Sequence, residues 1–315
     1  MINLSLLLFY SVFSLVDSLP QVLPGTREGI APVSQEAFSR ELLDGAHRFV
    51  DLKIEEANTE RMRDWTIGFS SKEQKEHFLS EKRDKLRSIL GIATQPVIVN
   101  KIELIANVSD PVEVAETNKY TIYQIKWPVL EGVFGEGLLL KPKVNPKGHF
   151  IVLPDADQIP EQLAGLAPGI AEGSQMARHL AENGFEVMVP TLINREVLEK
   201  DQSAREWIYR QAFQMGKHLI GFEVQQVLAI SQYWHNQGAD KIGLAGFGEG
   251  GLIALVAAAL DTNIDASLVS GYFGQQQEKW DEPIYRNIWD FSTHFGDAEL
   301  AAMVAPRGLV IEHSQ

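Results

Sequence analysis

A strand that turns through closely spaced glycines into a helix places the strongest constraint on how this chain folds. Residues 241–260 read Lys-Ile-Gly-Leu-Ala-Gly-Phe-Gly-Glu-Gly-Gly-Leu-Ile-Ala-Leu-Val-Ala-Ala-Ala-Leu. Glycine has no Cβ, so Gly246 and Gly250 let the backbone pass very close to itself at the turn. The stretch therefore predicts a buried strand, a sharp turn and an apolar helix that packs directly against that strand.

Strands and helices alternate from Gly148 onward, a pattern that indicates a parallel sheet with right-handed crossovers. We expect strands at 149–154, 185–190, 241–245, 266–270 and 308–312, and helices at 174–183, 205–235 and 252–260. The β-rich runs 97–108, 120–127 and 132–143 precede them and predict an antiparallel meander at the sheet edge. A charged pattern with apolar residues three and four apart predicts helix from 34 to 90.

Charge and cysteine content exclude several classes of function. The formal net charge is −14 and the pI is about 5.0. Nucleic acids and anionic membrane surfaces need clustered cations, so neither is an expected partner. The chain has no cysteine, which excludes disulfides and thiolate chemistry. A neutral carbohydrate or small ester is the ligand class that we expect.

The first 18 residues have the texture of a secretory signal peptide. Their apolar run is too short to span a bilayer and ends in the small-residue site Val16-Asp17-Ser18. The usual cationic start is missing, because no Lys or Arg precedes Arg27. We therefore expect a secreted or periplasmic bacterial protein with no membrane insertion after cleavage, and the alternative is a buried N-terminal segment.

Four segments in a fixed order resemble the acetyl xylan esterase and dienelactone hydrolase branch of the α/β-hydrolases. They are 215–228, the glycine turn, 257–261 and 305–311. The resemblance covers about 95–315 and implies the α/β-hydrolase fold: a mostly parallel sheet with helices on both faces, an antiparallel N-terminal edge and a helical region before it. The expected organisation is a signal peptide at 1–18, a helical region at 19–93 and the hydrolase domain at 94–315. The fold usually has a further strand and helix, so the resemblance also predicts a C-terminal continuation or a second domain of a longer protein.

The resemblance identifies the glycine turn as the nucleophile elbow of this fold, where small residues stand two before and two after a nucleophilic serine. That register places Gly248 at the nucleophile position, and a glycine has no side chain to attack with. Taking Glu249 as the nucleophile would place the Phe247 ring at a crowded position. The family's triad follows the order serine, acid, histidine, and His313 is the histidine after the late strand. We therefore predict a degenerate catalytic site at Gly248, Glu249 and His313.

The loop Pro154-Asp155-Ala156-Asp157-Gln158 follows a strand where this fold builds part of its oxyanion hole. Asp155, Asp157 and Phe247 are the expected ligand-binding residues. Asp-Xaa-Asp alone supplies too few oxygens for a cation, so no metal and no cofactor is expected. Glu249 has two readings: a residue that favours the positive end of the helix dipole, or a general base that acts on water.

Two further patterns leave alternatives open. The run Gly246-Phe-Gly-Glu-Gly-Gly251 also matches the dinucleotide-binding fingerprint, although the strand that follows lacks the acid expected for a ribose. Residues 205–210 combine arginines with aromatics, which suits either a sugar-contacting surface or a helix with ion-paired arginines.

The sequence thus predicts an exported carbohydrate-esterase-like domain that is catalytically degenerate. The alternatives are an active ester hydrolase that uses Glu249 or residues beyond this sequence, and a dinucleotide-binding oxidoreductase-type domain.

Overall fold

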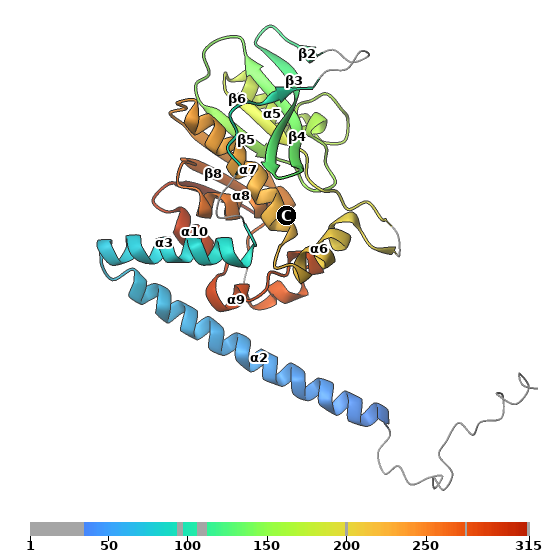
Figure 1. Ribbon diagram of the computed structural model, residues 1–315, viewed down its shortest axis with the longest axis vertical. Helices are drawn as coiled ribbons and strands as arrows, with labels where there is room; N and C mark the ends of the chain where they lie inside the picture. Colours follow the sequence, from blue (N-terminus) through green and yellow to red (C-terminus); the bar gives the residue numbers. More distant parts are fainter. Residues whose placement is uncertain (1–34, 93–96, 106–111, 199–200, 275, 314–315) are drawn as a thin grey trace, which may run out of the picture. The chain divides into compact units, whose positions relative to one another are not determined.

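The computed structural model describes residues 35–92, 97–105, 112–198, 201–274 and 276–313 (Figure 1). The signal peptide predicted at 1–18 lies outside these residues. Contacts divide the chain into two compact units, 1–53 and 54–315. Helix α2 (Gln35–Gly68) runs through the boundary and is followed by α3 (Lys72–Ile89).

A nine-stranded sheet in the second unit carries the fold. Its order is β1-β3-β4-β6-β5-β7-β8-β9, with β2 also paired to β3. Pairs among β1 to β4, and between β4 and β6, are antiparallel, whereas β6, β5, β7, β8 and β9 are parallel. The strands are β1 (Glu103–Leu104), β2 (Glu113–Glu116), β3 (Tyr120–Leu130), β4 (Val133–Pro142), β5 (His149–Leu153), β6 (Glu186–Pro190), β7 (Ile242–Phe247), β8 (Ala266–Ser270) and β9 (Gly308–Glu312).

Helices cover both faces of this sheet. Helices α4 (Pro160–Leu163) and α5 (Met176–Glu182) pack on β4, β5 and β6. On the opposite face lie α7 (Leu219–Asn236), α8 (Glu249–Leu260) and α10 (Asp297–Val304). Shorter elements connect them: η1 (Glu172–Ser174), α6 (Ala204–Gln214), η3 (Gln276–Asp281), η4 (Ile284–Arg286) and α9 (Phe291–His294).

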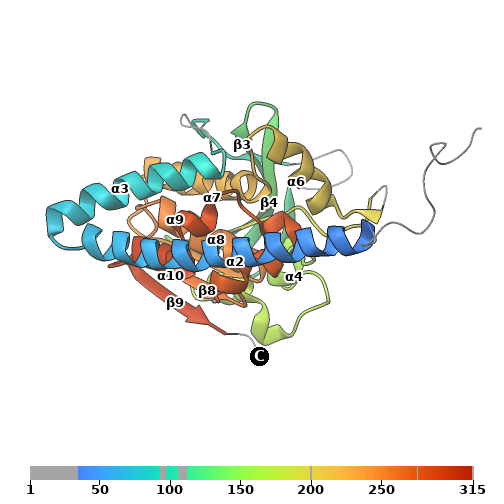
Figure 2. The same cartoon turned by 90° about the horizontal axis from the view of Figure 1, so that it is seen from below.

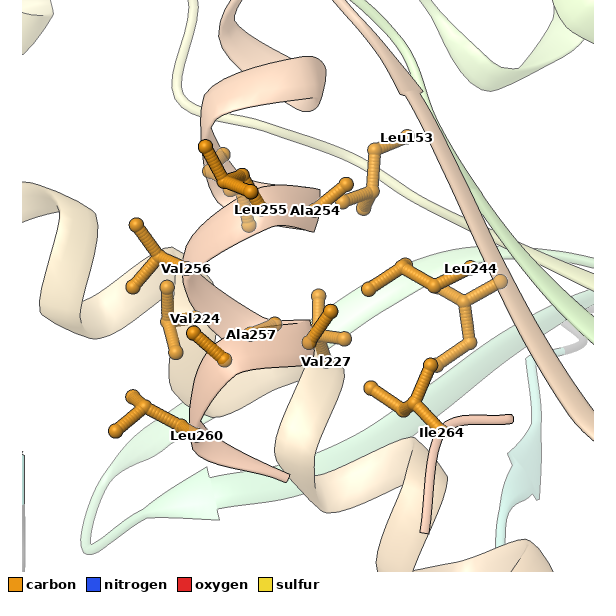
Figure 3. Close-up of a cluster of buried hydrophobic side chains, with 14 of the residues drawn as sticks. Leu153, Val224, Val227, Leu244, Ala254, Leu255, Val256, Ala257, Leu260 and Ile264 are labelled. Carbon is orange, nitrogen blue, oxygen red and sulfur yellow. The ribbon is translucent and has the colours of Figure 1, made fainter. Parts of the chain in front are cut away.

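Helix α8 lies at the centre of the main core, and all twelve of its residues are buried. Figure 3 shows its Ala254 and Ala257 among Leu153 of β5, Leu244 of β7 and the valines of α7. A helix buried on every side needs apolar residues all round, and small ones let its neighbours approach closely. The run of alanines in 254–259 meets this requirement.

Helix α3 belongs to the same core. Its Leu86, and Leu90 just after it, are fully buried. Gly221 of α7 lies against the end of α3, because a Cβ there would overlap with the backbone oxygen of Leu90.

The five predicted parallel strands are confirmed within two residues of their expected ends. The expected strand 97–108 is wrong for most of the residues described: only Glu103–Leu104 pairs, and β2, which was not expected, supplies the pairing with the middle of the meander. The helical region 205–235 is two helices, because Gly216 adopts a φ of 63° between α6 and α7. Helix α8 starts at Glu249, three residues before its expected start.

No helix among the described residues is both long and apolar enough to cross a bilayer.

Candidate functional site

The glycine turn between β7 and α8 has the backbone of a sharp elbow. Gly248 adopts φ 58° and ψ −118°, a conformation that L-residues avoid unless the surroundings impose it. A Cβ on Gly246 would overlap with the backbone of Gly250, and a Cβ on Gly250 would overlap with the carbonyl oxygens of Leu153 and Pro154. The two flanking glycines are therefore required by the close approach of strand and helix. Gly248 stands at the apex of the turn.

The carboxylate of Asp155 fills the space beside that apex. A Cβ on Gly248 would overlap with Asp155 Oδ1. The same oxygen accepts a hydrogen bond of 2.8 Å from the backbone N–H of Glu249, the first residue of α8. In α/β-hydrolases the N–H of the residue after the nucleophile helps to form the oxyanion hole. Here that donor is taken by a carboxylate of the chain itself.

Arg195, from the loop after β6, holds this carboxylate in place. Its guanidinium donates to both oxygens of Asp155, at 2.7 and 3.1 Å, and to Asp157 Oδ2 at 2.8 Å. Burial opposes the charge on Asp155, but the hydrogen bonds from Arg195 and Glu249 outweigh it and hold the pKa of Asp155 below its ordinary value. The bond to Asp155 in turn raises the pKa of Arg195 above its usual range.

The Glu249 side chain is fully buried behind the elbow. Its Oε1 accepts hydrogen bonds from Arg286 Nε at 2.9 Å, Arg195 Nη2 at 3.1 Å and the Tyr285 hydroxyl at 3.3 Å. Its Oε2 lies 3.7 Å from Nη2 of Arg205. Three guanidinium groups from three separate segments therefore surround one carboxylate.

Arg205 joins this cluster to α7 through a fully buried pair with Glu223. The two hydrogen bonds between them measure 2.8 and 2.9 Å, and Arg205 also donates to the backbone oxygen of Ile193. Burial alone would lower the pKa of Arg205, but the adjacent carboxylate of Glu223 raises it above the ordinary value. A bidentate arginine pair of this kind fixes orientation as well as charge.

A cavity of about 760 Å³ opens next to the elbow. Phe247, the last residue of β7, lines it and is 39% exposed. Ser270 and Glu312, at the ends of β8 and β9, form its polar side, and the Ser270 hydroxyl donates to Glu312 Oε2 at 2.7 Å. Much of the remaining lining is apolar and comes from α4 and α5: Leu163, Met176 and Leu180 are examples.

The family comparison bears directly on this arrangement. Residues 142–288 match the sequence model of the dienelactone hydrolase family, and they include the Asp155 loop, Arg195, the elbow and Arg286. This segment is a dienelactone hydrolase family domain. Within the domain, the family's elbow is retained as backbone, while its apex is glycine.

Solved structures agree on the fold. A protein assigned as an acetyl xylan esterase from Bacteroides fragilis aligns with a TM-score of 0.61 and 18% identity, over 76% of this chain and 68% of its own. Acetyl xylan esterase 1 from Thermoanaerobacterium aligns with a TM-score of 0.50 and 13% identity, over 75% and 86%. A glucuronoyl esterase from Solibacter usitatus gives 0.50 and 13%, over 73% of each chain. No curated protein matches the chain. The dienelactone hydrolase family domain therefore has an α/β-hydrolase fold of the carbohydrate-esterase kind.

The structure brings together four of the six predicted site residues. Asp155, Asp157, Gly248 and Glu249 meet around Arg195. Phe247 lines the adjoining cavity instead. His313 follows β9 and is exposed, and among the described residues no hydrogen bond or ion pair joins it to the elbow.

Sequence reasoning missed Arg195, Tyr285 and Arg286. They lie 54 residues before and 36 to 37 residues after Glu249, and no local pattern marks them. For Arg205, the ion-paired interpretation is confirmed by its contact with Glu223. The described residues contain no group of three or more His, Asp or Glu side chains arranged to hold a metal ion.

Proposed function

We propose that this domain is a catalytically silent relative of the carbohydrate esterases that binds a neutral sugar or a small sugar ester. The observation that carries the proposal is the hydrogen bond from the Glu249 N–H to Asp155 Oδ1 beside Gly248. Ester hydrolysis by this fold needs a nucleophile at the apex and a free N–H for the oxyanion. Gly248 supplies no nucleophile, and Asp155 brings negative charge to the place where an oxyanion would form.

The alternative in which Glu249 acts as a general base has less support. A general base must reach the proton that it removes, directly or through one water. Glu249 is fully buried, and its Oε1 accepts hydrogen bonds from two arginines and a tyrosine. We infer that Glu249 anchors the loops that carry these partners.

Dinucleotide binding also has little support. In the dinucleotide fold the pyrophosphate lies at the helix N-terminus after the glycine turn. At α8 that place is taken by the Asp155 carboxylate, with Asp157 on the same arginine. A pyrophosphate there would meet charge of its own sign.

The cavity beside the elbow suits a sugar. The half-exposed Phe247 ring offers an apolar face, and Gln158, Ser270 and Glu312 offer hydrogen-bonding groups around it. Cavities with an apolar wall and a few convergent polar groups are typical ligand sites.

The test combines turnover with binding. Aryl acetate hydrolysis is measured for the wild type, Gly248→Ser and the double variant Gly248→Ser/Asp155→Ala, and we expect none to exceed a buffer blank. A serine without an activating base regains little of the roughly millionfold contribution of a full triad. Wild-type turnover that is lost in Glu249→Gln would refute the proposal and make Glu249 the base.

Binding is measured by titration calorimetry with acetylated xylo-oligosaccharides. We expect saturable binding that weakens about tenfold in Phe247→Ala, because a stacked aromatic face contributes on the order of 1 kcal/mol. Phe134→Ala is the matched control, since this exposed ring lies on β4, away from the cavity lining. Equal losses in both variants, or no saturable binding, would remove the sugar-binding part of the proposal.

A further inference from the structure

A second cavity, of about 520 Å³, lies on a different part of the domain. Lys85 and Ser88 of α3 form one wall, and Phe213 and Lys217 come from the end of α6 and the link to α7. Trp289 and Asp290, just before α9, complete it. The two cavities share no lining residue.

Two aromatic rings at this cavity are exposed to solvent. Trp289 is 72% exposed and Phe213 is 44% exposed, although their ring centroids lie only 6.3 Å apart at 69°. Large apolar rings gathered at a hollow in the surface are a mark of ligand sites rather than of an inert surface. An indole face suits the C–H face of a sugar ring, while its edge stays in water.

The charge of the cavity runs against that of the whole chain. Two lysines and one aspartate line it, which leaves one net positive charge, whereas the chain carries −14. Lys85 Nζ lies 3.4 Å from Asp290 Oδ2, and Lys217 Nζ donates to the backbone oxygen of Gly91 at 2.9 Å. An ammonium group has three N–H donors, so each lysine keeps donors for a ligand. Burial lowers the pKa of His218, another lining residue, to about 4, so it adds no charge at neutral pH.

We propose that this second cavity binds a carboxylated sugar, that is, a uronic acid unit of an oligosaccharide. The pyranose ring stacks on Trp289 and Phe213, and the carboxylate pairs with Lys85 and Lys217. Ser88 and Asp290 provide hydrogen-bonding groups for the ring hydroxyls. The site is independent of the proposed function at the elbow, and it would let the domain hold an acidic polysaccharide at two points.

The experiment compares two disaccharides that differ by one carboxylate. Titration calorimetry of the full chain with cellobiouronic acid and with cellobiose separates the contribution of the carboxylate from that of the ring. We expect cellobiouronic acid to bind about tenfold more tightly than cellobiose at low salt, with the difference shrinking as salt rises. Benzoate tests whether any ring that bears a carboxylate suffices.

Two variants assign the contacts. Trp289→Ala is expected to weaken both disaccharides about tenfold, and Lys217→Gln to remove most of the preference for the acidic one. Trp280→Ala is the matched control, because Trp280 is 59% exposed but does not line the cavity. Phe247→Ala, at the first cavity, is expected to leave this binding unchanged, which separates the two proposals.

Three results would overturn the assignment. One is the absence of saturable binding of cellobiouronic acid up to about 10 mM. Another is equal affinity for cellobiose, which would remove the role of the lysines. The last is benzoate binding as tight as that of the sugar acid, which would assign the cavity to aromatic acids.

Discussion

At the scale of single residues, Gly248 and Asp155 form one unit. The absent side chain of Gly248 leaves room for the Asp155 carboxylate, and that carboxylate caps α8 by accepting the N–H of Glu249. A charged acceptor at a helix N-terminus is stabilising because it meets the unpaired N–H groups and the positive end of the helix dipole. The catalytic apex of the fold has thus become a helix cap.

This coupling can be measured with Gly248→Ala. We expect a loss of about 2–4 kcal/mol in the free energy of unfolding, because the new Cβ meets Asp155 Oδ1 and the backbone keeps a φ that disfavours alanine. The double variant Gly248→Ala/Asp155→Ala should lose less than the sum of the single changes, by at least about 1 kcal/mol. Urea denaturation followed by circular dichroism gives all four values.

Gly132→Ala is the control for that cycle. Gly132 also has a positive φ, 76°, but a Cβ there meets nothing within 4 Å. It should show backbone strain alone and no coupling to Asp155. Strict additivity of the Gly248 and Asp155 changes would contradict the proposed unit.

At the scale of elements, α7 begins with a histidine cap. His218 Nδ1 accepts the N–H of Ile220 at 3.1 Å, and its Nε2 lies 3.2 Å from the backbone oxygen of Asn287. Both contacts fit a neutral ring, in which Nδ1 is the acceptor and Nε2 the donor. Burial lowers the pKa of His218 to about 4, against 6.5 for an ordinary histidine.

The lowered pKa predicts a pH dependence of stability. Between pH 6.5 and 4 the unfolded chain takes up a proton at His218 that the folded chain does not, so stability falls as the pH falls through this window. The loss reaches about 3 kcal/mol near pH 4. His218→Asn keeps a capping oxygen without the titration, so it should reduce the difference in unfolding free energy between pH 7 and pH 4.5.

The same measurement on His77→Asn serves as a control, because the His77 side chain is 76% exposed. An unchanged pH dependence in His218→Asn would show that carboxylates alone cause the acid sensitivity.

The elements also show what the sequence could predict. The parallel strands were predicted well because strands buried on both faces are short apolar runs between clear turns. The break between α6 and α7 was missed because helical periodicity continues across Gly216, and only its φ of 63° ends the helix. The short β1 was overpredicted because strand-forming residues need a partner, and β2 took most of that place.

The site was predictable only in part, for a related reason. The resemblance located the elbow and the Asp155 loop, since both are local in sequence. The ion pairs of Glu249 depend on where the loops after β6 and β8 return, and that is decided by tertiary structure.

At the scale of the whole molecule, β9 leaves one side of the sheet open. Among the described residues it pairs with β8 alone, and it lies at the rim of the sheet in Figure 2. Its Val310 is 60% exposed. An apolar edge strand with unpaired backbone groups is a template for association with another chain.

We therefore expect the 315-residue chain to self-associate, and Val310→Lys to reduce this association. A lysine on an edge strand is a common device against strand pairing. Light scattering over about 1–100 µM protein measures the effect on mass. Val144→Lys is the control, because Val144 is 70% exposed but lies outside the strands. A wild-type chain that stays monomeric throughout this range would contradict the prediction.

The cap that Asp155 forms on α8 also has a consequence for descent. A lineage that returned to hydrolysis would need a nucleophile at 248 and the removal of the carboxylate at 155. The first change alone collides with Asp155, and the second alone uncaps α8 and takes a partner from Arg195. Each intermediate is expected to be less stable than its parent and still inactive, so selection would discard it. Loss of catalysis here acts as a ratchet, which leaves the domain free to diverge as a binding protein.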